Sequence, residues 1–148
     1  MKRERRELTE KDWQREFLLA GNAVFTIENT ETGNRFTYKV RRKENVDHWE
    51  KLHFVMVLTG PDNTSDYTYI GTIFKAEKFR STRGSAVAEN APSFKAFKWL
   101  WEQLGNGGPG LPEKVKFWHE GRCCRCGRVL TVPESIERGL GPECARKV

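Results

Sequence analysis

Apolar residues near the start of the chain recur with the period of an α-helix. Trp13, Phe17 and Ala20 follow one another at positions i, i+4 and i+7, between Thr9 and Gly21. A threonine followed three residues later by an acidic side chain is typical of a helix N-terminus, and glycine often follows the last turn. We therefore predict a short amphipathic helix between Thr9 and Gly21.

After this helix the pattern changes to alternation. Apolar side chains occupy every second position over residues 23–27 and again over residues 36–40, and residues 29–34 between them are turn formers. This pattern predicts a β-hairpin. One face of the hairpin is basic, because Lys39 and Arg41 alternate with apolar neighbours.

Two more strands follow the hairpin. Residues 53–59 are apolar on both faces, which is typical of a central strand, and residues 67–74 are rich in aromatic and β-branched side chains. The Gly-Pro-Asp-Asn sequence at residues 60–63 provides the turn between them. The sequence therefore predicts a four-stranded antiparallel meander.

A second helix is predicted after a basic, polar stretch at residues 75–91. Pro92 or Ser93 suits its first turn and Gly105 its end. Its large apolar residues fall on one side, and we expect this stripe to pack on the sheet rather than to bind a cofactor; they are Phe94, Phe97, Leu100, Trp101 and Leu104.

The chain is predicted to divide at a glycine-rich linker, residues 105–110. Residues 1–104 form an α+β body, in which helices cover the four-stranded antiparallel sheet. Residues 111–148 form a separate module of the treble-clef or knuckle-like type, too small to be stable through core burial alone.

Composition narrows the class of protein. The chain has 148 residues, a formal net charge of +6 and 11% aromatic residues, which suffices for one folded domain with a small addition. No apolar run approaches the ~20 residues of a membrane-spanning helix, and the charged start does not match a secretory signal peptide. We expect a soluble cytoplasmic protein whose modest basic surplus suits an acidic partner.

The four cysteines give the strongest chemical signal. All of them follow residue 122, and Cys123 and Cys126 enclose the two residues of a zinc knuckle. Cys144 is the expected third thiolate and His119 the expected fourth ligand. Cys124 is the alternative fourth ligand, but it would have to turn toward the same ion as its direct neighbour. The spacing predicts one structural Zn²⁺ that stabilises the module.

The sequence lacks the motifs of zinc hydrolases. Glu120 lies beside His119, but no His-Glu-x-x-His sequence and no deaminase signature is present. We expect no enzymatic activity, although the sequence leaves open a zinc-dependent reaction or a reactive thiol at Cys124, beside basic residues that would lower its pKa.

The C-terminal motif also carries a family resemblance. It runs as His119-x3-Cys123-x2-Cys126-Gly127-Arg128, then Gly139-x-Gly141-Pro142-x-Cys144. This resembles a small zinc-motif domain of uncharacterised proteins from bacteriophages, plasmids and actinobacterial mobile elements. Members usually carry another residue where this chain has Cys124, which favours His119 as a ligand. The resemblance implies a zinc site and a phage-like origin but no reaction.

Two functions from different classes fit these observations. The first is binding of DNA or RNA without sequence preference, with Tyr67 and Tyr69 as stacking platforms and a set of phosphate-binding cations; these are Lys39, Arg41, Arg42, Lys43, Arg122, Arg125 and Arg128. The alternative is a phage-encoded inhibitor of a host defence protein, such as a CRISPR nuclease or another nuclease, whose basic surface fills an acidic groove. The arginines near the cysteines have a further explanation, because they can neutralise the zinc thiolates.

Overall fold

The computed structural model describes residues 7–43, 52–62, 65–75, 77–105 and 108–119. Its helices and strands are α1 (Lys11–Leu19), β1 (Asn22–Asn29), β2 (Arg35–Arg42), β3 (Leu52–Leu58), β4 (Tyr67–Phe74), β5 (Lys78–Arg80), α2 (Pro92–Leu104) and β6 (Val115–His119). Neither helix in this part of the chain is long and apolar enough to cross a membrane.

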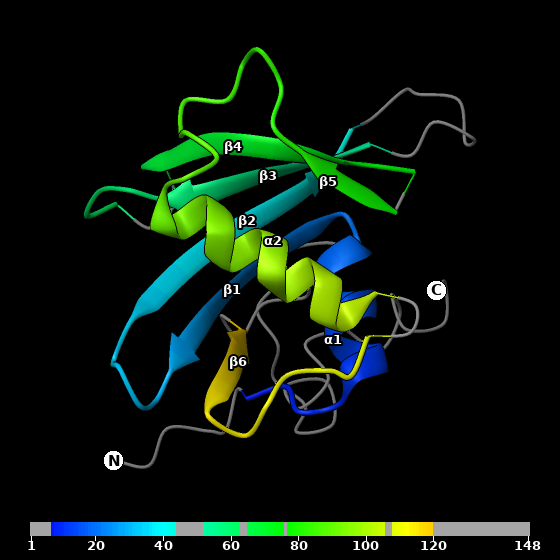
Figure 1. Ribbon diagram of the computed structural model, residues 1–148. Coiled ribbons are helices and arrows are strands. Elements are labelled where there is room, and N and C mark those ends of the chain that lie inside the picture. The colour runs from blue at the N-terminus through cyan, green and yellow to red at the C-terminus, as the bar shows by residue number, and fades with distance from the viewer. Residues whose placement is uncertain (1–6, 44–51, 63–64, 76, 106–107, 120–148) are drawn as a thin grey trace.

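The fold is mixed α+β, as predicted, but the sheet is larger than expected. Its strand order is β5-β4-β3-β2-β1-β6, and every neighbouring pair is antiparallel. The four predicted strands form its centre, and β5 and β6 extend it at the two ends. Both helices lie on one face of the sheet (Figure 1).

The strand β6 corrects the predicted position of the domain boundary. We assigned residues 111–148 to a separate module, yet Val115–His119 pairs with β1 in the body. Phe117 is 1% exposed, and its ring stacks on that of Phe25 with 4.6 Å between centroids. Leu111 also packs against the core. Residues 111–119 therefore belong to the body, because the apolar side of β6 is buried against β1 and α1.

The strand β5 was not predicted. It has three residues, and Phe79 is the one apolar side chain among them. The Phe79 ring lies 5.0 Å from Phe94 and 4.7 Å from Phe97 of α2, between ring centroids. Pairing with β4 and one inward aromatic residue thus hold this short strand under the second helix.

The core lies between the sheet and the helices. All five residues of the predicted stripe on α2 are buried, which confirms it as a packing face. The Tyr38 hydroxyl of β2 donates a hydrogen bond to the Ser93 carbonyl at 2.7 Å and so joins the sheet to the start of α2. Burial raises the pKa of Tyr38 above its usual range, because the phenolate would lose its hydration there.

The first helix begins later than its predicted cap. Glu10, and not Thr9, precedes the first helical residue, and its side chain makes no capping hydrogen bond. The start of α1 is instead held by tertiary contacts: the Gln14 amide donates to the Leu8 carbonyl at 2.6 Å, and Leu8 is 1% exposed. The Leu8 amide donates in turn to the Phe117 carbonyl at 2.7 Å, which ties this end of the chain to β6.

Candidate nucleic-acid interface

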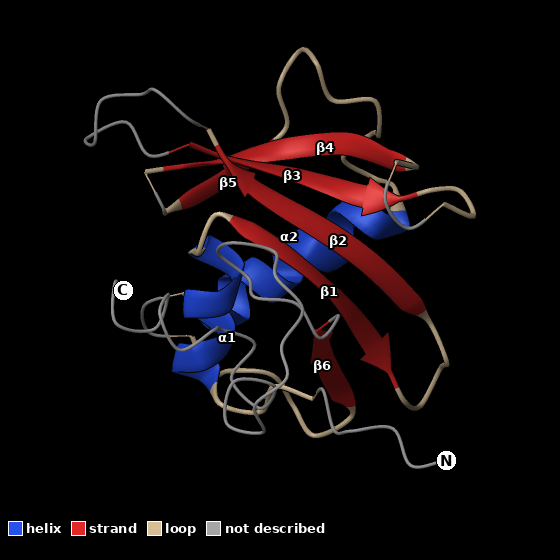
Figure 2. Ribbon diagram, turned by 180° about the vertical axis from the view of Figure 1, so that it is seen from behind, coloured by secondary structure: helices blue, strands red, loops and turns tan. Residues whose placement is uncertain are grey.

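The face of the sheet turned away from α1 and α2 carries aromatic, apolar and basic side chains together. Figure 2 views the sheet from this side, with α2 behind the strands. We call it the open face. Its members alternate along each strand with buried core residues or lie opposite one another in the pairing; those used below are Lys39, Arg41, Phe54, Met56, Tyr67, Tyr69, Thr72, Phe74, Lys78 and Arg80.

The open face arises from a strand that is apolar on both sides. In β3, His53, Val55 and Val57 point into the core, whereas Phe54 and Met56 are half-buried on the open face. The sequence correctly predicted a central strand here. The two helices of the described chain cover one side of it alone, so the aromatic and apolar residues of the other side stay partly accessible.

Four residues that lie opposite one another across β2, β3, β4 and β5 form a row with a cation at each end. Arg41 of β2 lies opposite Phe54 of β3, Phe54 lies opposite Thr72 of β4, and Thr72 lies opposite Arg80 of β5. Both arginines are exposed. Their backbone positions are about 14 Å apart, because three strand spacings of about 4.8 Å separate them. Two guanidinium groups therefore lie on the same side of the twisted sheet as Phe54, while Thr72, between Phe54 and Arg80, is buried.

The neighbouring row adds a third cation beside a second aromatic ring. Lys39 lies opposite Met56, and its Nζ atom is 5.4 Å from the centroid of the Tyr67 ring. Partial burial, together with the positive charge of Arg41, lowers the pKa of Lys39. Two like charges held side by side repel each other, and a bound anion would relieve this repulsion.

Tyr69 is held in a fixed orientation on the open face. Its ring meets Phe54 edge-to-face with 6.1 Å between centroids, and its hydroxyl hydrogen-bonds to Thr72 and, at 2.8 Å, to Thr82. Ile70 is the extra residue of a bulge between β4 and β3, so Tyr69 remains on the open face while Ile70 enters the core. A ring fixed in this way loses little conformational entropy when a flat ligand stacks on it.

The structure separates the basic residues predicted on the hairpin. Lys39 and Arg41 share the open face, but Arg42 lies opposite His53 and so belongs to the other side of the sheet. Lys43 follows the end of β2 and is exposed. The candidate cations Lys39, Arg41 and Arg42 therefore do not share one face, because adjacent residues of a strand point to opposite sides.

Two aromatic and two basic residues are among the members of the open face that the sequence did not identify as candidates. Phe54 and Phe74 were assigned to strands without a function, and Lys78 and Arg80 to a basic loop. The sequence did contain one signal for this face. The strand β3 is apolar on both sides, and the predicted helices could cover only one of them. Lys78 and Arg80 reach the open face because β5 pairs with β4, and local sequence does not reveal this pairing.

The predicted zinc ligand His119 is the last residue of β6. It lies opposite Phe25 and is 3% exposed, and its ring centroid is 6.0 Å from that of Phe17. The imidazole is therefore on the core side of the sheet, at the point where the chain continues toward the cysteines. Its donor type suits Zn²⁺ beside thiolates, since imidazole and cysteine sulfur are the usual ligands of structural zinc sites.

The remaining residues of the predicted zinc centre lie outside the described part of the chain. These are Cys123, Cys124, Cys126 and Cys144, together with the arginines Arg122, Arg125 and Arg128. Within the described residues, no three His, Cys, Asp or Glu side chains gather where they could hold a metal ion. The zinc centre thus remains a prediction.

Comparison with known proteins identifies one family match. Residues 117–148 match the model of DUF6011, a family of unknown function. No curated protein and no solved structure matches the chain. The matched segment begins at Phe117, within β6, so the region shared with that family starts inside the sheet of the body.

Proposed function

We propose that the open face binds single-stranded nucleic acid without sequence preference. The observation that carries this proposal is the row Arg41, Phe54, Thr72 and Arg80, in which two exposed guanidinium groups flank an aromatic side chain. Lys39 and Tyr67 add a third cation and a second aromatic ring next to it. Aromatic platforms for unstacked bases, combined with cations that follow the phosphates, are how single strands are bound without reading their sequence.

A single strand suits this surface better than a duplex. The bases of a duplex are stacked on each other and cannot reach Phe54, Tyr67 or Tyr69 with their faces. Neither described helix lies on the open face to enter a major groove, and both pack against the other side of the sheet. The binding energy is therefore expected to come from phosphate contacts and base stacking.

Binding to short fluorescent single-stranded DNA and RNA, measured by anisotropy over a range of salt concentrations, tests this function. Each phosphate contact on a single strand contributes about 0.7 to the slope of log affinity against log salt. The double variant Lys39→Ala/Arg41→Ala should bind more weakly and lower this slope by about 1.4. Replacement of Tyr67 by leucine should weaken binding about fivefold or more while leaving the slope unchanged.

A matched control removes the same charge from the other side of the molecule. Lys95 and Lys98 are exposed residues of α2. The variant Lys95→Ala/Lys98→Ala should keep the wild-type affinity and slope. If no single strand bound even at low salt, the proposal would be contradicted. The alternative function would then remain, in which the basic surface of this protein fills an acidic groove of a host protein and inhibits it.

We further propose that Zn²⁺ is held by His119, Cys123, Cys126 and Cys144. The ion would supply the folding free energy that the short segment after β6 lacks, on the order of 10 kcal/mol for such sites. His119 is the last residue of β6, so a metal ion held by it would be joined to the body through this strand. No catalytic step is assigned to the ion.

Elemental analysis of the purified protein should find about one zinc per chain. The Cys126→Ser and Cys144→Ser variants should lose it, because each removes a thiolate ligand. Cys124→Ala is the matched control and should keep the metal. Loss of zinc in Cys124→Ala, with retention in Cys126→Ser, would instead make Cys124 a ligand, and a folded wild-type protein without zinc would contradict the site.

A further inference from the structure

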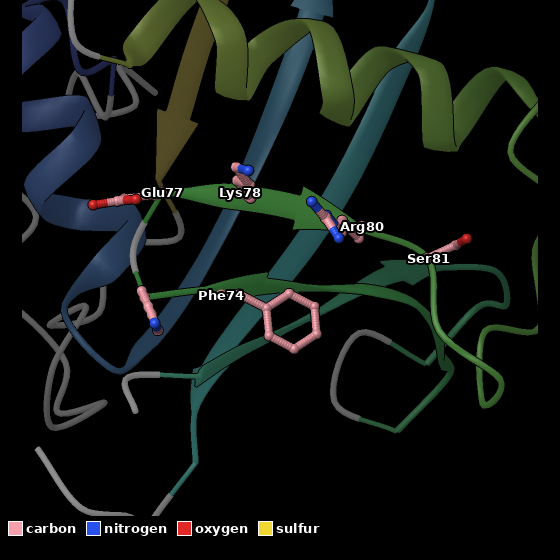
Figure 3. A pocket seen from close by; sticks show the side chains of 6 residues that line it. Phe74, Glu77, Lys78, Arg80 and Ser81 are labelled. Atoms are coloured by element: carbon pink, nitrogen blue, oxygen red, sulfur yellow. The ribbon is translucent and has the colours of Figure 1, made fainter. Parts of the chain in front are cut away.

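A pocket opens where the turn between β4 and β5 meets the open face. It has a volume of about 530 Å³ and is lined by Phe74, Lys75, Glu77, Lys78, Arg80 and Ser81. Figure 3 shows the strands β4 and β5 running past it, with Lys78 and Arg80 on one strand and Phe74 on the other. Its volume is within the range of small-molecule sites, and it is open to solvent, because four of its six lining residues are exposed.

Positive charge dominates the lining of this pocket. Three of its six residues are cations, and none of them forms an ion pair with a described residue. The one carboxylate, Glu77, points away from Lys78 and Arg80 (Figure 3). The Ser81 hydroxyl donates to the Glu89 carboxylate at 2.6 Å, outside the lining. An anion bound between these three exposed cations would be attracted by all of them.

The backbone around the pocket is held in place from several sides. The Glu77 amide donates to the Phe74 carbonyl at 2.9 Å and closes the turn, and the Trp101 indole donates to the Glu77 carbonyl at 2.9 Å. Lys75 has a φ of 54°, in the left-handed region that costs a side-chain-bearing residue about 1 kcal/mol or more. A lysine thus occupies a position where glycine would be less strained.

We propose that this pocket binds a phosphate monoester attached to a nucleoside. A monoester carries about −2 near neutral pH, against −1 for an internal phosphodiester, so it suits three cations better than the strand backbone does. The half-buried Phe74 ring lies opposite Lys78 and offers a surface for the adjoining base or sugar. The ligand is either the phosphorylated end of a strand or a free nucleotide.

In its strand-end form this inference rests on the proposed function. Arg80 belongs both to the pocket and to the row that ends at Arg41, so the two sites are continuous. A strand lying across the open face would therefore bring its terminal phosphate to Lys75 and Lys78. A free nucleotide would need the pocket alone.

Anisotropy with oligonucleotides of one sequence tests the inference. The three probes carry a 5′ phosphate, a 3′ phosphate or hydroxyls at both ends, and nucleoside monophosphates serve as competitors. We expect one phosphorylated end to bind about tenfold more tightly than the hydroxyl-ended strand, since charge-assisted hydrogen bonds to a dianion are strong. Competition by a monophosphate but not by its nucleoside would show that the pocket also takes the free nucleotide.

The Lys75→Gly variant separates binding from folding. It removes one cation and relieves the left-handed backbone, so thermal stability should be unchanged or slightly higher. The preference for the phosphorylated end should nevertheless fall severalfold, and Lys78→Ala should reduce it similarly. Lys95→Ala, on the far side of the sheet, is the matched control and should keep the full preference.

The outcomes distinguish the two proposals. Equal binding of all three probes by the wild-type protein would overturn the pocket and leave the proposed function intact. Binding of a nucleoside monophosphate that Lys75→Gly weakens, with no binding of any oligonucleotide, would support the pocket and overturn the proposed function. Absence of binding by every probe would overturn both.

Discussion

Replacing Phe117 with alanine is expected to lower the free energy of unfolding by about 3–5 kcal/mol. The Phe117 side chain is 1% exposed, stacks on Phe25 and meets Phe17 edge-on with 5.6 Å between centroids. Removing its ring would leave a cavity between β6, β1 and α1. Denaturant unfolding followed by tryptophan fluorescence or circular dichroism would measure the loss.

The adjacent Lys116 provides the control for this substitution. It lies on the other side of β6, where its ammonium group is 3.5 Å from the Glu7 carboxylate. Such partly exposed ion pairs contribute little, so Lys116→Ala should change stability by about 1 kcal/mol or less. If Phe117→Ala were equally mild, β6 would not be an integral strand of the body.

Alanine at Gly71 is expected to destabilise the fold by about 1–3 kcal/mol, through overpacking rather than through a cavity. A Cβ atom there would lie 2.6 Å from the Arg80 carbonyl oxygen and 2.7 Å from the Phe79 ring. The carbonyl belongs to the backbone and cannot rotate away, so β5 would have to move from β4. Thermal unfolding measures the loss of stability.

The same substitution should also affect binding. A displaced β5 carries Lys78 and Arg80 away from the pocket, so Gly71→Ala should lose the preference for a phosphorylated strand end. Gly84→Ala is the control, because a Cβ there meets the Tyr69 ring at an ordinary 3.5 Å. Unchanged stability and an unchanged end preference in Gly71→Ala would contradict the close approach of the two strands.

Local pattern was sufficient for the elements that carry several regularly spaced apolar residues. The hairpin, β3, β4 and α2 were predicted close to their observed bounds, and β4 runs over Tyr67–Phe74 as expected. The arms of the hairpin alternate in polarity, β3 is apolar on both sides, and α2 repeats its apolar residues with the period of a helix. The aromatic stripe of α2 was correctly interpreted because a helix with such a face must bury it.

Elements held by distant contacts were not predicted, or were assigned wrongly. The three residues of β5 contain no alternation beyond Phe79, and Arg80 becomes part of a surface through its pairing with Thr72. The sequence did indicate a strand ending at His119, but a glycine-rich segment suggested that it lay in another module. Its partner β1 is far away in the chain, and local spacing does not encode such pairing.

The candidate site divides in the same way. The sequence alone identified Lys39, Arg41, Tyr67 and Tyr69 as candidates and a cysteine motif with metal-ligand spacing, because side-chain chemistry is visible residue by residue. Only the tertiary structure separated Arg42 from Arg41 and brought Phe54, Lys78 and Arg80 to the same face. The reason is physical: strand alternation and pairing register decide which side chains share a face, and the register is set by burial of the opposite side against α1 and α2.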